Sequence, residues 1–159
     1  MKKLMLTLLQ VVFVFVITSA QKNQIPLIGA EAPTFTAQST DGKITFPDNF
    51  GDSWKILFSH PRDFTPVCTS ELLELAYMKN DFERLNVKLA VISTDNIEQH
   101  NLWKNHLEGL DYKKRGAQKI TFPIIDDSKA VVSKQYGMLH EPVSTTEDVR
   151  GVFIIDDQF

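Results

Sequence analysis

The chain has 159 residues, of which 23% are charged and 43% hydrophobic, and its formal net charge at pH 7 is −3. This composition is typical of one globular domain and excludes a disordered chain or a disulfide-stapled miniprotein. The single cysteine excludes an internal disulfide, a four-cysteine zinc site and a C-x-x-C redox centre. The slightly acidic balance lacks the basic face that nucleic-acid binding requires, so no nucleic-acid partner is expected.

The first twenty residues have the three-part pattern of a secretory signal peptide. A positively charged start at 1–3 precedes an almost wholly apolar run at 4–17 and small residues at 18–20. The apolar run is shorter than the roughly 18 to 20 residues of a bilayer span. We therefore expect a signal peptide at 1–20 and an exported domain at 21–159, in the periplasm or outside the cell. The alternatives are an uncleaved N-terminal membrane anchor and a buried N-terminal element.

The rest of the chain alternates strands and helices after a hairpin. The hairpin is expected at 35–46, around an Asp41-Gly42 turn. The further expected elements are buried strands at 54–59 and 87–93, a helix at 65–85, a helix at 97–110 capped by Thr94, Asp95 or Asn96, a strand at 122–126, a helix at 128–136 ended by Gly137, and a last strand at 149–155. This order predicts an α/β sandwich with a central mixed sheet. Because the chain stops directly after a strand, we expect it to be part of a longer protein.

The segment His60-Pro-Arg-Asp-Phe-Thr-Pro-Val-Cys68 joins a predicted strand to a predicted helix. Thr65 followed by Pro66 fits a helix N-cap and a proline at the first helical position, which places Cys68 in the first turn. Free backbone N–H groups and the positive end of the helix dipole stabilise a thiolate there. His60 and Arg62 are close enough in sequence to add positive potential. The alternative is a buried structural cysteine, which is the commoner fate of a free thiol.

The pattern Pro61-x-x-x-Thr65-x-x-Cys68 resembles the active-site motif of the peroxiredoxins. The stretch 58–72 is similar to their one-cysteine, peroxiredoxin-6-like subgroup, and the similarity continues through 87–95, 122–127 and 150–156. This resemblance implies a thioredoxin-like three-layer α/β/α sandwich around a central mixed sheet, with a C-terminal strand and helix missing from this chain. It also implies a thiol-dependent peroxidase that needs no metal, haem or flavin cofactor.

The resemblance further implies how such a site works. Cys68 attacks the terminal oxygen of hydrogen peroxide or an organic hydroperoxide and becomes a sulfenic acid. Thr65 hydrogen-bonds the peroxide through its hydroxyl, and Pro61 shields the site from water. Since the sequence holds no second cysteine, an external thiol has to resolve the sulfenic acid: a small molecule, a thioredoxin- or glutaredoxin-like protein, or a missing C-terminal part. An unresolved sulfenic acid over-oxidises. The family commonly forms homodimers.

Three further residues are expected around the thiolate. Arg150 matches the family's active-site arginine, whose fixed donors hold the thiolate and stabilise charge on the departing oxygen. The alternative for Arg150 is a surface ion pair with Glu147 or Asp148. His60 is a candidate for tuning the thiolate without touching the peroxide. Glu71 is expected to orient Arg150 or to lie on a helix face.

Two other kinds of chemistry are weakly supported. Some members of the resembling subgroup are credited with a phospholipase activity at a G-x-S-x-G motif. Here Gly51-Asp-Ser53-Trp-Lys55 lacks the last glycine, and Pro47 stands where that subgroup has a histidine, so the base that a serine hydrolase needs is missing. For a metal site, His100 and His106 are six apart on a helix and share no face. His140 and Glu141 form a lone pair in a loop. His100, His106 and His140 are all expected to be solvated.

A non-enzymatic interpretation stays open beside the peroxidase. The chain is then an inactive thioredoxin-like binding module or a truncated gene product, with one sheet edge and one sheet face uncovered. The two interpretations differ in chemistry, because only the peroxidase requires a Cys68 that reacts with peroxide.

Overall fold

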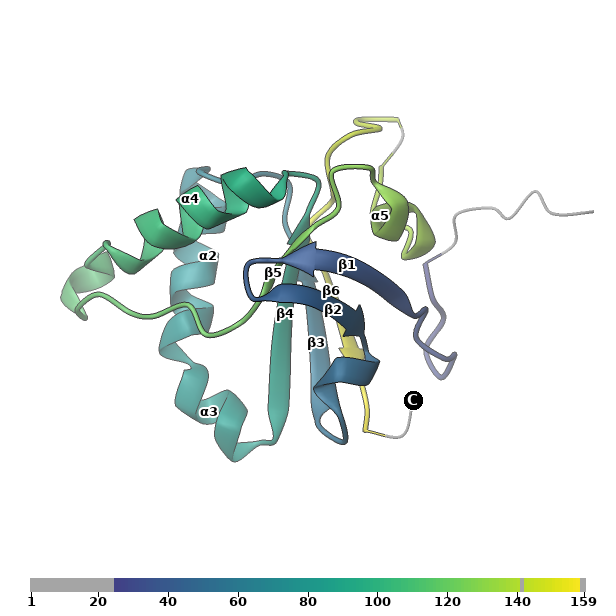
Figure 1. The fold of residues 1–159 in the computed structure, drawn as a ribbon, viewed down its shortest axis with the longest axis horizontal. Coiled ribbons are helices and arrows are strands. Elements are labelled where there is room, and N and C mark those ends of the chain that lie inside the picture. The colour runs from purple at the N-terminus through teal and green to yellow at the C-terminus, as the bar shows by residue number, and fades with distance from the viewer. Residues whose placement is uncertain (1–24, 141, 158–159) are drawn as a thin grey trace, which may run out of the picture.

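The computed structural model describes residues 25–140 and 142–157, which form one mixed sheet flanked by helices (Figure 1). The expected signal peptide at 1–20 lies outside the described residues. Within the described ranges, no helix is long and apolar enough to cross a bilayer.

The sheet has six strands in the order β2-β1-β5-β4-β3-β6. Strands β3, β4 and β5 are parallel, whereas β1 runs antiparallel to β2 and β5, and β6 runs antiparallel to β3. The central mixed sheet predicted from the sequence is therefore confirmed. Its strands are β1 (Phe35–Ser39), β2 (Gly42–Phe46), β3 (Trp54–Ser59), β4 (Val87–Ser93), β5 (Ile124–Asp126) and β6 (Gly151–Ile155).

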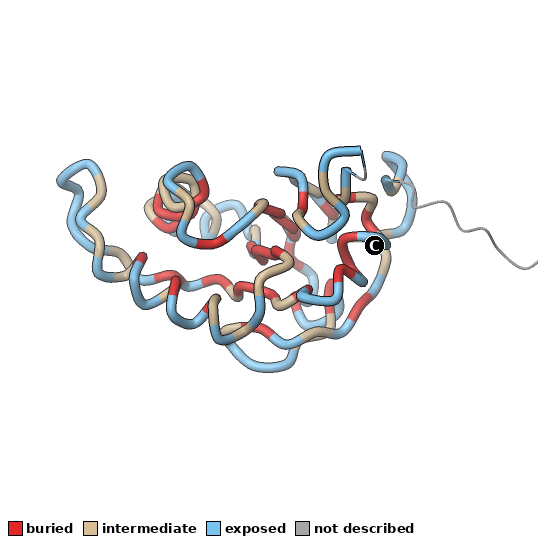
Figure 2. Tube along the Cα trace, turned by 90° about the horizontal axis from the view of Figure 1, so that it is seen from above, coloured by how far each residue is buried: buried red, intermediate tan, exposed pale blue. Residues whose placement is uncertain are grey.

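Side chains of the central strands alternate between two apolar cores, one on each face of the sheet. On one face, Phe58 and Val91 pack with Leu72 and Trp103 from two long helices. On the other, Leu57 and Ile92 pack with the hairpin and with Tyr136. Buried stretches run through the middle of the molecule and exposed ones form its outline (Figure 2). The helices are α2 (Pro66–Tyr77), α3 (Lys79–Arg84), α4 (Ile97–Glu108) and α5 (Val131–Gln135), with 3₁₀ turns η1 (Asp48–Phe50) and η2 (Tyr112–Lys114).

The prediction of a single helix at 65–85 is wrong, because the chain forms α2 and α3 with Met78 between them. The Met78 N–H bonds to the carbonyls of both Glu74 and Leu75, and the Met78 carbonyl accepts from Asp81 and Phe82. The backbone hydrogen bonds thus continue through the junction while the axis changes. An apolar stripe does not reveal such a junction, since its spacing is preserved.

Four other elements are shorter than expected, and one of them is the helix expected at 97–110, which ends at Glu108. The strand at 122–126 forms over Ile124–Asp126, and the strand at 149–155 over Gly151–Ile155. The helix at 128–136 begins only at Val131, because Ala130 adopts φ 52° and the Asp127 carboxylate accepts from the N–H groups of Val131, Val132 and Ser133. Of the three candidate caps of α4, Asn96 is the one whose side chain accepts from the first turn.

Candidate active site

Cys68 is the third residue of α2, at the end of the turn that follows β3. Thr65 is the N-cap and Pro66 the first helical residue, as the sequence predicts. The first backbone bond across this cap joins the Thr69 N–H to the Thr65 carbonyl at 2.9 Å. The N–H groups of Val67 and Cys68 therefore lie ahead of it, where a helix N-terminus favours negative charge. Cys68 is 1% exposed.

Arg150 reaches Cys68 from the far end of the chain. Its Nη2 donates to Cys68 Sγ at 3.3 Å, and its Nε donates to Glu71 Oε2 at 2.8 Å. Burial alone lowers the pKa of Arg150, but the hydrogen bonds with Cys68 and Glu71 more than offset that effect and raise it. The guanidinium thus lies between a carboxylate and a sulfur on one helix. Arg150 therefore pairs with Glu71, and the alternative of a surface ion pair with Glu147 or Asp148 is wrong.

The β3–β6 register explains how Arg150 arrives there. Ser59, the last residue of β3, lies opposite Gly151, the first residue of β6. The buried Ser59 hydroxyl donates to the Val149 carbonyl at 2.7 Å and accepts from the Gly151 N–H at 3.0 Å. It therefore binds both flanks of Arg150. Sequence reasoning missed Ser59, although a hydroxyl at the end of an otherwise apolar strand was a signal.

Thr65 and Pro61 lie in the turn before Cys68, and in the described part of the chain no hydrogen bond joins the Thr65 hydroxyl to the thiol. The Thr65 hydroxyl donates to the Arg62 carbonyl at 3.1 Å, which leaves its oxygen free to accept. Pro61 is half-buried in the same turn. The guanidinium of Arg62 pairs with Glu147 at the surface. Among the described residues, Arg150 is the hydrogen-bond partner of Cys68.

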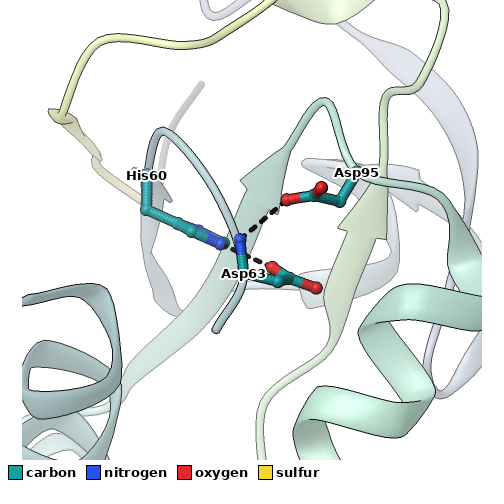
Figure 3. Close-up of side chains that lie close together, drawn as sticks. All are labelled: His60, Asp63 and Asp95. Atoms are coloured by element: carbon teal, nitrogen blue, oxygen red, sulfur yellow. Dashed lines mark hydrogen bonds and ion pairs between the residues drawn. The ribbon is translucent and has the colours of Figure 1, made fainter. Parts of the chain in front are cut away.

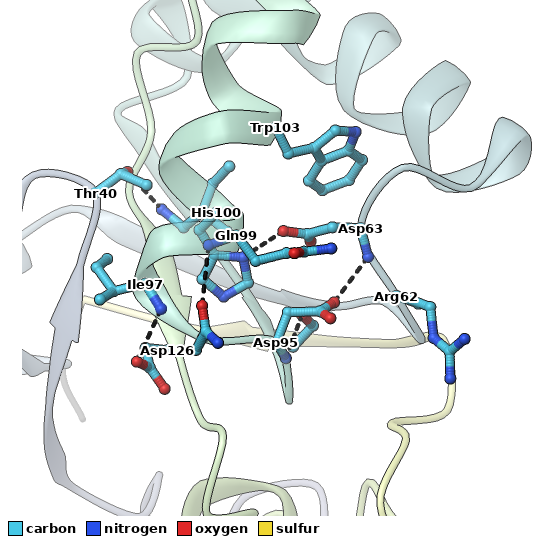
Figure 4. A network of polar contacts seen from close by, with 12 residues as sticks. Thr40, Arg62, Asp63, Asp95, Ile97, Gln99, His100, Trp103 and Asp126 are labelled. Carbon is cyan, nitrogen blue, oxygen red and sulfur yellow. Dashed lines mark hydrogen bonds and ion pairs between the residues drawn. The ribbon is translucent and has the colours of Figure 1, made fainter.

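Behind the turn lies a buried network centred on Asp63 (Figure 4). Asp63 Oδ1 lies 2.8 Å from His60 Nε2, and Asp63 Oδ2 lies 2.7 Å from His100 Nδ1. Burial raises the pKa of Asp63, but the hydrogen bonds with His100 and His60 outweigh it and leave the pKa below its usual value. The expectation that His100 is solvated is wrong: it is fully buried, and its Nε2 donates to the Ile125 carbonyl at 3.1 Å.

His60 lies between this network and the helix that carries Cys68. Its ring packs on Trp103 at a centroid distance of 5.0 Å, and Trp103 Nε1 donates to the Thr69 hydroxyl at 3.4 Å. His60 Nδ1 is buried, and no protein atom of the described residues hydrogen-bonds it. His60 thus adjoins the site through Trp103 packing and not through a bond to Cys68.

Ligand atoms of His60, Asp63 and Asp95 lie within 4.8 Å of one another (Figure 3). The Asp63 N–H donates to Asp95 Oδ2 at 2.8 Å, and that oxygen also accepts from the Ser93 hydroxyl. These atoms therefore already have protein partners, and hydrogen bonding accounts for the cluster.

The residues of the other candidate chemistries lie apart from Cys68. Ser53 is buried, and its hydroxyl donates to the side-chain oxygen of Asn86, an amide that is no general base. His106 and His140 are exposed, as the sequence predicts for loop and helix-surface histidines.

Residues 28–159 match the AhpC/TSA family. The chain is 47% identical over 135 residues to a peroxiredoxin of Methanosarcina mazei, covering 84% of this chain and 62% of that protein. It is 47% identical over 113 residues to peroxiredoxin-6 of Bos taurus, covering 71% and 50% of the two chains. The chain thus spans between half and two thirds of these relatives' length.

Two solved structures share the fold. One, of a yeast mitochondrial 1-Cys peroxiredoxin, superposes with a TM-score of 0.67 at 37% identity, covering 80% of this chain and 61% of that one. The other, of a cysteine-to-serine mutant of peroxiredoxin 6 from Arenicola marina, gives a TM-score of 0.69 at 33% identity, covering 87% and 61%. The thioredoxin-like architecture expected from the resemblance is therefore confirmed. The family match, the identities and the shared fold together show that this chain belongs to the AhpC/TSA family, the peroxiredoxins, and is similar to its one-cysteine members.

Proposed function

We propose that this chain is a thiol-dependent peroxidase that uses Cys68 to reduce hydrogen peroxide and organic hydroperoxides. The observation that carries the proposal is the 3.3 Å contact between Arg150 Nη2 and Cys68 Sγ in the first turn of α2. A guanidinium keeps its charge at every physiological pH, so the sulfur has a permanent cationic partner. A reactive cysteine needs such an electropositive setting because the thiolate is the nucleophile.

The proposed first step is a displacement on oxygen. The Cys68 thiolate attacks the terminal peroxide oxygen, an S–O bond forms, and the O–O bond breaks with its electron pair leaving on the second oxygen. That oxygen takes a proton and departs as water or an alcohol, while Cys68 becomes a sulfenic acid. Negative charge moves from sulfur to the leaving oxygen, and the guanidinium of Arg150 stabilises it there.

Thr65 and Pro61 complete the proposed peroxide site. The Thr65 hydroxyl already donates to the Arg62 carbonyl, so its oxygen is oriented to accept a hydrogen bond from the peroxide O–H. Pro61 offers no N–H and presents an apolar ring at the turn, which favours exclusion of water. Glu71 acts by orienting Arg150 through the 2.8 Å bond at Nε.

Turnover requires a thiol from outside the 159 residues of this sequence, because Cys68 is their single cysteine. One reducing thiol condenses with the sulfenic acid to give a mixed disulfide and water, and a second thiol releases Cys68 by exchange. The yeast relative's structure is described as that of a thiol-resolving mechanism through glutathione and thioredoxin systems. For this chain we propose a small-molecule thiol or a thioredoxin- or glutaredoxin-like protein as reductant, acting in an exported location.

We also propose that the chain forms a homodimer, as peroxiredoxins typically do. Val152 and Ile154 on the edge strand β6 are 56% and 67% exposed, which leaves apolar surface for a neighbour. Light scattering during size-exclusion chromatography distinguishes a dimer from a monomer directly.

The test of the peroxidase is a single turnover. The purified protein is mixed with one equivalent of hydrogen peroxide, and intact mass follows the addition of one oxygen, with Cys68→Ser as control. Oxidation orders of magnitude faster than that of a free thiol, absent from the control, is expected. Oxidation no faster than a free thiol in a folded sample would favour the inactive binding module instead.

A further inference from the structure

The segment that delivers Arg150 is tied to the other side of the sheet just before it arrives. Leu139 and Asp148 form an isolated antiparallel bridge, and the Val149 N–H donates to the Met138 carbonyl at 2.7 Å. Met138 directly follows the turn that ends α5, so these backbone contacts join the segment to the α5 side. Asp148, two residues before Arg150, is only 3% exposed.

Asp148 is the unexplained group in this segment. Both of its carboxylate oxygens are buried, and neither has a hydrogen-bond partner among the described residues. A carboxylate without donors is costly to bury, since its solvation is lost and nothing replaces it. The arrangement therefore requires either a proton on Asp148 or a reason to tolerate the charge.

The groups facing Asp148 favour the proton. From the α5 side it meets the Ser133 hydroxyl and, beyond it, the buried Asp127. Ser133 donates its hydroxyl proton to Asp127 Oδ2 at 2.5 Å. A hydroxyl has one proton to give, so Ser133 can only accept from Asp148. The neutral carboxyl is therefore the form of Asp148 that this neighbour tolerates, because an ionised one would face a hydroxyl oxygen with no proton left to give.

The charges around Asp148 also favour the neutral carboxyl. Burial raises the pKa of Asp148 to about 7, and repulsion from Asp127 acts in the same direction. On its own segment, Glu147 pairs with Arg62 and Arg150 with Glu71, while His140 at the segment's start is exposed. Within the described ranges, no cation pairs with Asp148, so ionisation leaves two carboxylates around one hydroxyl.

We propose that Asp148 is a positioning residue for Arg150: its buried, neutral carboxyl lies beside the hydrogen-bonded pair Ser133–Asp127 and lets the Arg150 segment stay packed against the α5 side. This inference rests on the proposed function of Cys68. When Asp148 loses its proton, a buried carboxylate without a donor stands beside Asp127, the segment loosens, and the guanidinium loses its place at Cys68 Sγ. Cys68 then reacts more slowly at a pH where a simple thiol becomes more nucleophilic.

The test compares the wild type with Asp148→Asn. The side-chain amide resembles the neutral carboxyl in size and shape and cannot ionise. Cys68 reactivity is measured between about pH 5.5 and 9 in two ways, as oxidation by hydrogen peroxide and as alkylation by iodoacetamide, and thermal unfolding is followed over the same range. Asp52→Asn, at an exposed aspartate, is the matched control.

We expect equal rates for the wild type and Asp148→Asn at about pH 6. At about pH 8.5 the wild type falls behind by about tenfold, because a small displacement of a positioning group costs that much or more. Asp52→Asn follows the wild type throughout.

Matching pH profiles in the wild type and Asp148→Asn overturn the inference. So does a difference confined to thermal unfolding, which makes Asp148 structural only. Slow peroxide oxidation in all variants, with alkylation profiles that still separate, overturns the proposed peroxidase and supports the Asp148 inference, because alkylation reports on the thiolate without peroxide chemistry.

Discussion

Arg150 Nη2 lies 3.3 Å from Cys68 Sγ although the two residues are 82 positions apart in the chain. The contact depends on the antiparallel pairing of β6 with β3, which brings the start of β6 to the end of β3, where the turn to Cys68 begins. The buried hydroxyl of Ser59 holds both neighbours of Arg150 at that point. A cation of fixed charge is thereby held against a helix N-terminal thiol.

Replacing Arg150 by alanine is expected to slow oxidation of Cys68 by hydrogen peroxide about 10²- to 10³-fold, the cost of removing one donor to a developing oxyanion. Arg150→Lys is expected to recover little, because an ammonium cannot donate to Glu71 and to sulfur in the same fork geometry. Stopped-flow single-turnover rates measure both effects. Arg84→Ala, which removes an exposed arginine paired with Asp81, is the control, and equal rates for Arg150→Ala and Arg84→Ala contradict the prediction.

Replacing Glu71 by glutamine is expected to slow the same reaction about 10- to 100-fold, since a hydrogen bond to a charged group contributes about 1.5–3 kcal/mol. The amide still fills the space but holds the guanidinium less firmly. Glu74→Gln is the matched control, because Glu74 lies one turn further along α2 and pairs with Lys113 and Arg115 instead. The orienting role of Glu71 is wrong if both variants react alike.

Replacing Asp63 by asparagine is expected to lower the free energy of unfolding by about 3–5 kcal/mol, because it leaves His60 and His100 without their buried charged partner. The pKa of Asp63 is lowered by folding, so its contribution is present above the unfolded pKa near 4 and is lost as pH falls below it. Urea unfolding at about pH 7 and about pH 3 measures this. The variant should differ from the wild type less at the lower pH.

The control for Asp63 is Asp81→Asn, which removes an exposed carboxylate paired with Arg84. It is expected to change the free energy of unfolding by less than about 1 kcal/mol, as is usual for surface pairs. An Asp63→Asn effect as small as this one shows that the buried network contributes little.

Gly137 ends α5 at φ 63°, and a Cβ there would lie 2.8 Å from the Ile25 backbone nitrogen. Gly29 has φ 82° with nothing within 4 Å of a Cβ. Both alanine variants carry the left-handed strain of roughly 1–2 kcal/mol, but only Gly137→Ala adds a clash with backbone. We expect Gly137→Ala to lower the free energy of unfolding by at least about 1 kcal/mol more than Gly29→Ala in urea titrations, and equal losses contradict this.

Local patterns predicted much of this fold. The Asp41-Gly42 turn between alternating segments indicated the hairpin, and the Thr65-Pro66 pair indicated the helix start that places Cys68, because both signals depend on neighbouring residues. Errors arose where a distant or hidden partner decided the outcome. Asp127 delays the start of α5 by taking three backbone N–H groups, and periodicity contains no information about such a cap.

By itself, the sequence determined that one cysteine stands at the first turn of a helix after a buried strand, and that its surroundings resemble those of peroxiredoxins. Only the tertiary structure decided that Arg150 bonds to Cys68 and Glu71 and that His100 is buried against Asp63. It also decided that the buried carboxylate oxygens of Asp148 have no hydrogen-bond partner among the described residues. Helix caps and turns depend on residues a few positions apart. Contacts between distant charges depend on strand register and burial, which arise when the sheet assembles.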